Sequence, residues 1–283
     1  MSAIKRATRP FFGVATSGDQ LFYEESIEFD WHSGMSWIVR QRSSDALAEA
    51  IVAKYGKEKY GKRGVGRDEI LEVSTASHSF EIGRALSATI LSYQDEATNE
   101  RYAVENWFQA AKVFERDGSD REWGPYPGLL ECDHPKRYVD GNLPSKLRAH
   151  YEGDSLFDEV QCGVIGSRLK CFRMDGRDYP LMPRSAFYDH LYVKALFQDR
   201  NADLADSLCK YRVFTDIMFN PGSGKRRRFN TQARSCAIYA ALAKRGYGRD
   251  DIADFDSFVR LVGYKEKQEG RAGADGLRTS TLF

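Results

Sequence analysis

Residues 99–115 read NERYAVENWFQAAKVFE and form the clearest amphipathic pattern in the chain. This spacing predicts one helix, closed by Gly118. On such a helix Glu105, Gln109 and Lys112 stand at i, i+4 and i+7, so all three project from one face. A solvated polar face is the ordinary explanation of such a stripe. The surrounding residues favour burial instead, and buried polar groups need partners or a function; these neighbours are Trp107, Phe108, Ala110, Ala111 and Val113.

Strand patterns open the chain and helical patterns close it. Residues 11–34 alternate apolar and polar positions around the turn signal Ser17-Gly18-Asp19, which predicts two strands. A short strand is expected within 70–77 and a hairpin within 167–181, around Asp175-Gly176. Helical spacing predicts further helices over residues 43–56, 140–153, 183–198, 201–211, 230–246 and 254–263.

These elements predict a single α+β domain that is predominantly helical and has a small N-terminal β element. The domain is expected to span residues 1–265, and residues 266–283 are expected to be a polar, mobile tail. There is no alternation of strands and helices of the β-α-β kind, no Gly-x-Gly-x-x-Gly motif and no Walker loop. The sequence therefore argues against a doubly wound nucleotide-binding fold.

Composition excludes several classes of protein. The chain of 283 residues has 42 Lys and Arg against 41 Asp and Glu, so any affinity for nucleic acid must come from a local basic patch. No apolar run approaches the roughly 20 residues of a bilayer span, and no secretory signal is evident, so we expect a cytoplasmic protein without membrane contact. The five cysteines are scattered and without zinc-ligand spacing. We expect reduced thiols, no metal site and no cofactor.

Three blocks of sequence resemble the NADAR family. The string AVENWFQAAK (103–112) is similar to its signature helix, GRDYPLMPRSAFYDHLY (176–192) to its middle block, and FTDIMFNP with FNTQARSCAIYAALAKRG (214–246) to its closing block. The opening residues 16–34 and the Gly-Pro-Tyr loop resemble the antitoxin branch associated with DarTG-type guanine-modifying toxins. The resemblance covers residues 10–262. Tyr179 or a neighbour stands where many relatives carry a tryptophan, so a base-stacking role does not transfer directly to that position.

The resemblance implies an α+β glycosidase that cleaves the C1″ bond between ADP-ribose and the exocyclic amine of guanine. Such a reaction needs an acid or base for the leaving amine and a group that stabilises or traps the anomeric carbon. Glu105 is the first candidate for proton transfer. Lys112 could bind the diphosphate or form a Schiff base with the opened ribose. Asp216 could orient the ribose hydroxyls or share proton transfer, or it could simply form the turn before Asn220-Pro221-Gly222.

The remaining predicted contacts surround these three residues. Asn230 is expected to cap the last long helix and also to bind substrate. Trp123 and Tyr126 could stack on a base, or could be ordinary loop aromatics. The full set of predicted substrate contacts is Ser87, Gln109, Trp123, Gly124, Tyr126, Tyr179, Asn230, Gln232 and Arg234.

A run of four cations, Lys225, Arg226, Arg227 and Arg228, precedes the last long helix. Such a run is usually a solvated loop, but here it could hold the DNA backbone without reading the sequence. The expected partners are therefore ADP-ribosylated DNA, ADP-ribose as the product and a cognate DNA ADP-ribosyltransferase toxin. Two alternatives stay open: an N-glycosidase of phosphoribosylated riboflavin intermediates, and a non-enzymatic antitoxin that binds its toxin.

Overall fold

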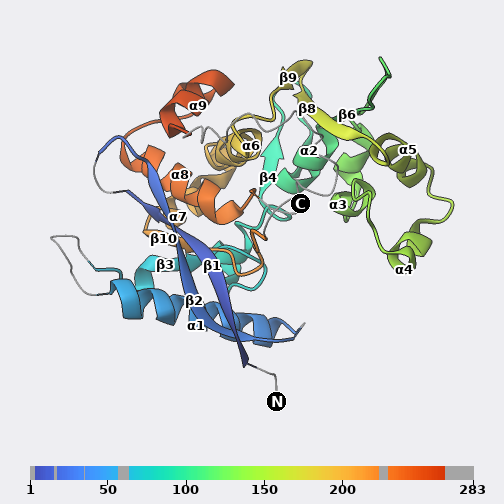
Figure 1. The fold of residues 1–283 in the computed structure, drawn as a ribbon. Helices are drawn as coiled ribbons and strands as arrows, with labels where there is room; N and C mark the ends of the chain where they lie inside the picture. Colours follow the sequence, from blue (N-terminus) through green and yellow to red (C-terminus); the bar gives the residue numbers. More distant parts are fainter. Residues whose placement is uncertain (1–3, 16–17, 35, 57–63, 223–228, 265–283) are drawn as a thin grey trace. The chain divides into compact units, whose positions relative to one another are not determined.

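The computed structural model describes residues 4–15, 18–34, 36–56, 64–222 and 229–264 (Figure 1). The chain forms two compact units. Unit 1 takes residues 1–91, 192–221 and 231–263, and unit 2 takes residues 92–191, 222–230 and 264–283. Each unit combines helices with sheet, so the α+β class is confirmed. The predicted tail, 266–283, lies outside the described residues, and the domain boundary at residue 265 stays a prediction.

Unit 1 is built on a four-stranded sheet. Its strand order is β2-β1-β10-β3, with bounds Ile4–Val14 (β1), Phe22–His32 (β2), Ile70–Glu72 (β3) and Val213–Thr215 (β10). β1 and β2 pair antiparallel along 11 residues each, which confirms the predicted N-terminal strand pair. β10 runs antiparallel to β1 and parallel to β3. Short β3 thus lies beside a strand that is 143 positions away in the sequence, as Val213 pairs with Ile70.

Helix α1 (Trp37–Tyr55) packs along the β1–β2 hairpin (Figure 1). The core between them contains Phe11, Phe29, Leu47 and Ile51. Gly56 ends the helix as predicted, but the predicted start at residue 43 is wrong. Ser36 is the N-cap, accepting a hydrogen bond from the Val39 amide, and the helix is longer because Ser43 Oγ bonds the backbone of His32 instead of capping.

Helices α7, α8 and α9 of unit 1 lie within the predicted ranges 201–211, 230–246 and 254–263, whereas the short turns η1, η2 and η7 were not predicted. Each apolar face turns inward; Phe255, Phe258 and Val262 of α9 are buried, and Gly263 ends that helix in the left-handed conformation that glycine favours. The elements are η1 (Arg67–Glu69), the π-turn η2 (Phe80–Arg84), η5 (Asp199–Asn201), α7 (Ala202–Leu208), α8 (Gln232–Lys244), η7 (Asp250–Ile252) and α9 (Phe255–Val262).

Unit 2 contains a strand where the sequence predicts the end of a helix. Residues 101–103 form strand β5, which pairs with β4 (Ser92–Gln94). Helix α2 covers only Val104–Ala110, and strand β6 (Lys112–Glu115) begins two residues after its end. The prediction of one helix over 99–115 is therefore wrong. Val113 and Phe114 favour a strand, and they pair with Cys171 and Leu169 of β8, a partner about 55 residues away that local spacing cannot reveal.

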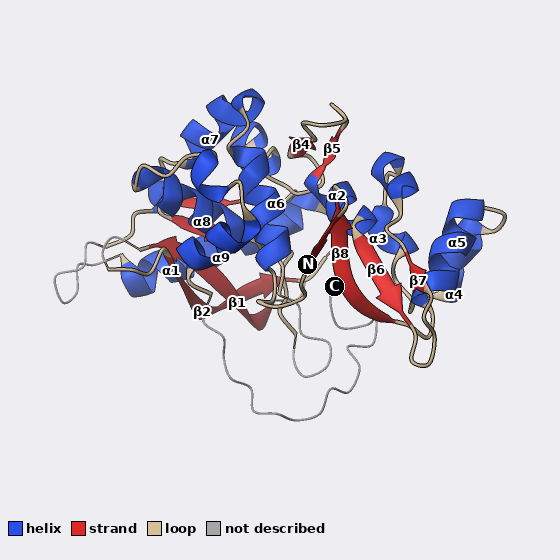
Figure 2. Cartoon of the chain, turned by 90° about the horizontal axis from the view of Figure 1, so that it is seen from above, coloured by secondary structure: helices blue, strands red, loops and turns tan. Residues whose placement is uncertain are grey.

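The second sheet of unit 2 has the order β7-β6-β8-β9, and Figure 2 labels its strands β7, β6 and β8. The predicted hairpin around Asp175-Gly176 is confirmed as β8 and β9. Strand bounds in this unit are Ser92–Gln94 (β4), Arg101–Ala103 (β5), Lys112–Glu115 (β6), Glu122–Trp123 (β7), Arg168–Met174 (β8) and Arg177–Tyr179 (β9). With three sheets among the described residues, a small N-terminal β element in a mainly helical chain is not confirmed.

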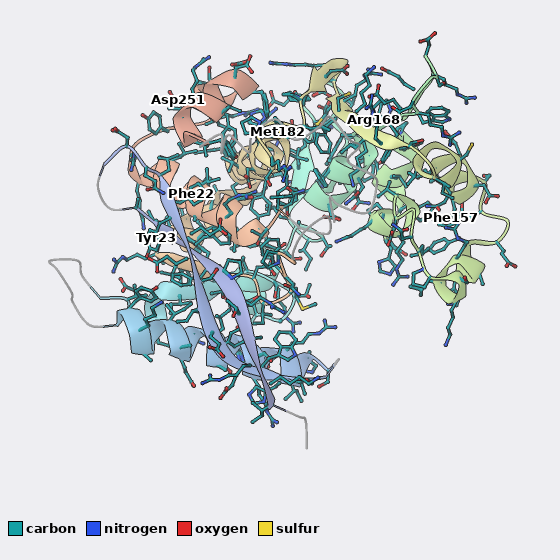
Figure 3. The ribbon with its side chains drawn as sticks, viewed as in Figure 1. Phe22, Tyr23, Phe157, Arg168, Met182 and Asp251 are labelled. Atoms are coloured by element: carbon teal, nitrogen blue, oxygen red, sulfur yellow. The ribbon has the colours of Figure 1, made fainter. Side chains whose placement is uncertain are left out.

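Short helices cover one end of this sheet. Phe157 of α5, labelled in Figure 3, stacks on Tyr151 with ring centroids 4.7 Å apart, and Tyr138 packs edge-on against both rings. The elements are η3 (Pro127–Glu131), α3 (Pro135–Tyr138), α4 (Ser145–Arg148), η4 (Ala149–Tyr151) and α5 (Ser155–Val164). Helix α6 (Ala186–Leu196) begins three residues after the predicted Pro183 and runs from unit 2 into unit 1.

No helix within the described ranges is long and apolar enough to cross a membrane.

Candidate functional site

Glu105, Gln109 and Lys112 come from α2 and the first position of β6. Gln109 Nε2 donates a hydrogen bond to Glu105 Oε1 at 2.8 Å, as their i, i+4 spacing allows. Gln109 is 1% exposed and Lys112 0%, whereas Glu105 is half-buried. The helical face expected to carry all three residues does not extend to Lys112. Lys112 instead lies on strand β6, and its Nζ is 5.1 Å from the centroid of the Phe108 ring of α2.

Complete burial dominates the electrostatics of Lys112. It lowers the pKa of the amine well below the ordinary value of 10.5, because the charged form loses its hydration. Glu105 opposes this shift by attracting the ammonium form, as does Asp140, while Lys136 adds to the lowering. Burial therefore favours a neutral amine, which is the form of lysine that attacks carbonyl carbon.

One oxygen in this group has no protein partner. Gln109 Oε1 is buried and accepts no hydrogen bond from any described residue. Buried amide oxygens are nearly always satisfied, so this oxygen requires a partner beyond the described residues, such as a water molecule or a ligand. The arrangement brings a carboxyl group, an amine and an amide oxygen to one helix-to-strand junction.

The predicted contacts Trp123, Gly124 and Tyr126 pack against this junction. The Tyr126 amide donates to Ala110 O at 2.7 Å, and a Cβ on Gly124 would lie 2.2 Å from Lys112 O. Tyr126 is 3% exposed, and burial raises the pKa of its hydroxyl. Trp123 is half-buried, with the Arg116 guanidinium 4.5 Å from its ring centroid. The loop thus holds the backbone at Lys112 in place.

Tyr179 lies at the end of β9. Its ring packs against Phe187 at 4.9 Å between centroids, and the Arg177 guanidinium lies 5.4 Å from it.

A second group of predicted residues lies in unit 1. Gln232, the first residue of α8, accepts a hydrogen bond from the Ala88 amide at 3.0 Å, so α8 begins beside the segment that contains Ser87. Ser87 is 4% exposed and its hydroxyl bonds Thr89 Oγ1 at 3.0 Å. Arg234, the third residue of α8, is half-buried.

Asp216 ties the end of β10 to the start of α8. Its Oδ1 accepts from the amides of Met218 and Phe219, each at 3.1 Å, which is the turn-forming role that the sequence left open. Its Oδ2 accepts from Thr231 Oγ1 at 3.0 Å. Thr231 in turn caps α8 by accepting from the Ala233 amide, so the prediction that Asn230 is the cap is wrong. Threonine one position later supplies the hydroxyl at the required extended backbone geometry.

Glu72, on β3, was missed by the sequence analysis. It is 8% exposed and its carboxyl group bonds Thr215 and Ile217, on either side of Asp216. A signal was present, because Glu72 is a lone carboxylate within the apolar run ILEV, where burial was expected.

The predicted DNA contacts Lys225, Arg226, Arg227 and Arg228 lie outside the described residues. Within the part of the chain that the structure describes, no three His, Cys, Asp or Glu side chains are grouped so as to hold a metal ion.

Comparison with known sequence families defines the class of protein. The chain belongs to the NADAR proteins, since a family profile matches residues 7–140 and 164–272, well over half of its length. The matching family is described as the DarT1-associated NADAR antitoxin. No curated protein matches the chain. Both resemblances noted in the sequence, to the family and to its toxin-associated branch, are thereby confirmed.

The match omits residues 141–163, which carry α4, η4 and nearly all of α5. The junction at Glu105, Gln109 and Lys112 lies in the first matched range, and Asp216 and α8 lie in the second.

Proposed function

We propose that the protein is an N-glycosidase that removes ADP-ribose from the exocyclic amine of guanine in DNA, reversing the action of a DNA ADP-ribosyltransferase toxin. Membership of the DarT1-associated family supports an antitoxin role linked to that toxin. The observation that carries the enzymatic part is the wholly buried Lys112, whose amine interacts electrostatically with Glu105, the residue to which Gln109 donates a hydrogen bond. A protein that only bound its toxin would have no need of a desolvated lysine, which is costly to the fold.

The chemistry breaks the bond between C1″ of the ribose and the guanine amine. Protonation of the ring oxygen breaks the C1″–O4″ bond and leaves an imine between C1″ and the guanine nitrogen. Lys112 Nζ adds to C1″, Glu105 takes the proton that Nζ loses and passes it to the guanine nitrogen, and the C1″–N bond to guanine breaks, which leaves Lys112 joined to the ribose as a Schiff base. Water then adds to the resulting Schiff base, which releases ADP-ribose and returns the lysine amine. Gln109 holds Glu105 in place by donating a hydrogen bond from Nε2. Its Oε1, which has no partner among the described residues, accepts a hydrogen bond from a substrate hydroxyl.

The other predicted residues have supporting roles in this proposal. Asp216 orients ribose hydroxyls or shares in proton transfer, as the family resemblance implies. Lys225, Arg226, Arg227 and Arg228 hold the phosphate backbone while the modified guanine leaves the base stack.

Comparison of substrates tests the function. The purified chain is incubated with an oligonucleotide that carries ADP-ribosyl-guanine and, separately, with phosphoribosylated riboflavin intermediates, and the released sugar is quantified. Release of ADP-ribose from the oligonucleotide supports the proposal. Cleavage of the small molecules alone would assign the riboflavin-related activity. Tight binding to the toxin without cleavage of either substrate would make the protein a binding antitoxin.

Covalent trapping tests the role of Lys112. Borohydride added during turnover should reduce the Schiff base, and mass spectrometry should locate the ADP-ribosyl adduct on Lys112. Lys112→Arg cannot form this adduct, and full activity of that variant would rule out the covalent route.

A further inference from the structure

Two buried carboxyl groups are adjacent in unit 1. Glu72 lies directly opposite Thr215 in the parallel pairing of β3 with β10. Its carboxyl group accepts a hydrogen bond from Thr215 Oγ1 at 2.7 Å and from the Ile217 amide at 3.0 and 3.2 Å. Glu72 therefore holds the residue before Asp216 and the residue after it. The two carboxyl residues are 8% and 7% exposed, so water screens their interaction weakly.

Asp216 has the surroundings of an ionised carboxylate. It accepts three hydrogen bonds, from the amides of Met218 and Phe219 and from the Thr231 hydroxyl. Arg9 of β1 adds an attractive charge, since Asp216 raises the pKa of that half-buried guanidinium against the larger lowering by burial. Donors and a nearby cation both favour the charged form of an acid.

At Glu72, burial and the nearby like charge outweigh the hydrogen bonds that favour ionisation. Burial, and then repulsion from Asp216, raise its pKa to about 8, although hydrogen bonds from Ser74, Thr215 and Ile217 act to lower it. Within the described ranges, the groups that set this pKa include no cation. Cys236 of α8 also interacts electrostatically with Asp216, and burial keeps that thiol neutral by raising its pKa. Two like charges in one buried site cannot both form cheaply, so the pair holds one proton near neutral pH, and the raised pKa of Glu72 favours that residue as its holder.

We propose that Glu72 is a positioning residue for Asp216: its carboxyl group holds the turn that follows β10 by accepting hydrogen bonds from Thr215 and Ile217, on either side of Asp216. Ionisation of Glu72 places a second negative charge beside Asp216 and loosens the turn that joins β10 to α8. This inference rests on the proposed function, because Glu72 acts through a residue to which that function gives a role.

A pH profile of glycosidase activity tests the inference. The full-length chain is assayed between about pH 6 and about pH 9.5 as wild type, Glu72→Gln and Asp68→Asn. Wild type should lose activity above about pH 8, and Glu72→Gln should raise the ratio of activity at high pH to that at neutral pH by about threefold or more. Asp68 is exposed on neighbouring η1, so its variant removes the same charge and should follow wild type. Coincident profiles of Glu72→Gln and wild type would overturn the proposal.

A second measurement does not depend on activity. Carbon-13 NMR of the glutamate carboxyls, with the Glu72 signal assigned by its loss in Glu72→Gln, should show a titration near pH 8 that moves to lower pH in Asp216→Asn. A Glu72 titration at its ordinary value of 4.5, or one indifferent to Asp216→Asn, would overturn the proposal. If the chain proved to have no glycosidase activity, the proposed function would fail, and this titration would still decide whether Glu72 is the neutral partner.

Discussion

Lys112 shows how a single residue can link stability to chemistry. Its side chain is wholly buried, and the fold leaves it beside a half-buried carboxylate and an aromatic ring. Withdrawing an amine from water costs free energy, and proteins accept such costs mainly at functional sites. The same desolvation that makes the residue costly also makes it a better nucleophile.

Lys112→Met should therefore stabilise the protein near neutral pH, by about 1–3 kcal/mol. Burial lowers the pKa of Lys112 in the folded state, so the unfolded chain binds the proton more tightly, and wild type gains stability as the pH rises from the folded pKa towards 10.5. The advantage of the variant should consequently shrink towards about pH 10. Urea unfolding of both proteins at neutral pH and at about pH 10 measures this difference in the free energy of unfolding. A variant less stable than wild type at neutral pH would contradict this account of Lys112.

Gln109→Leu should lower glycosidase activity by about tenfold to a hundredfold, since Glu105 loses its donor and the substrate loses an acceptor. Gln94→Leu is a matched control, because Gln94 is a half-buried glutamine of β4 in the same unit. Steady-state kinetics of both variants, with their thermal unfolding midpoints, separates catalysis from stability. Equal activities in the two variants would remove Gln109 from the site.

At the scale of elements, the junction of α2 with β6 explains both the success and the failure of the sequence analysis. The apolar setting of Glu105, Gln109 and Lys112 predicted their burial, and Gln109 and Lys112 are buried. Helical spacing could not reveal the end of α2, because β6 depends on pairing with distant β8. Glu72 was missed for a similar reason: its partners are Thr215, the last residue of β10, and Ile217 just beyond it, 143 and 145 positions away in the sequence. Local patterns predicted the hairpins and most helices, whose stabilising contacts are close in sequence.

Gly124 tests the packing of this junction. Its φ is +92°, and an added Cβ would also lie 2.2 Å from Lys112 O, a backbone atom that cannot move aside. Gly124→Ala should therefore destabilise the protein by about 3 kcal/mol or more. Gly118→Ala shares the left-handed backbone, with φ +76°, but meets no atom within 4 Å, so it should cost only about 1 kcal/mol. Equal losses in denaturant unfolding would show that the contact with Lys112 O is unimportant.

At the scale of the whole molecule, the fold class and the family were accessible from the sequence, while the division into two compact units was not. Each unit is assembled from segments distant in the chain, and that assembly is set by long-range packing rather than by local composition. The candidate residues divide accordingly. Glu105, Gln109 and Lys112 belong to unit 2, and Ser87, Asp216, Gln232 and Arg234 belong to unit 1.

The segment 141–163 distinguishes this chain from the family profile. It carries α4, η4 and most of α5, and it is held to the matched part of unit 2 by the packing of Tyr138 on Tyr151 and Phe157. Gln161 adds a hydrogen bond to the carbonyl of Tyr138 at 2.6 Å. These helices therefore pack against the matched part of unit 2.

The most direct measurement of the central claim is multiple-turnover repair of DNA by wild type and Glu105→Gln. An oligonucleotide bearing ADP-ribosyl-guanine is supplied in excess over enzyme, and mass spectrometry follows the return of unmodified guanine together with free ADP-ribose. We predict many turnovers by wild type and a loss of at least about a hundredfold in Glu105→Gln, as expected for removal of a proton donor. Repair by the variant at the wild-type rate, or none by wild type on a verified substrate, would contradict the account.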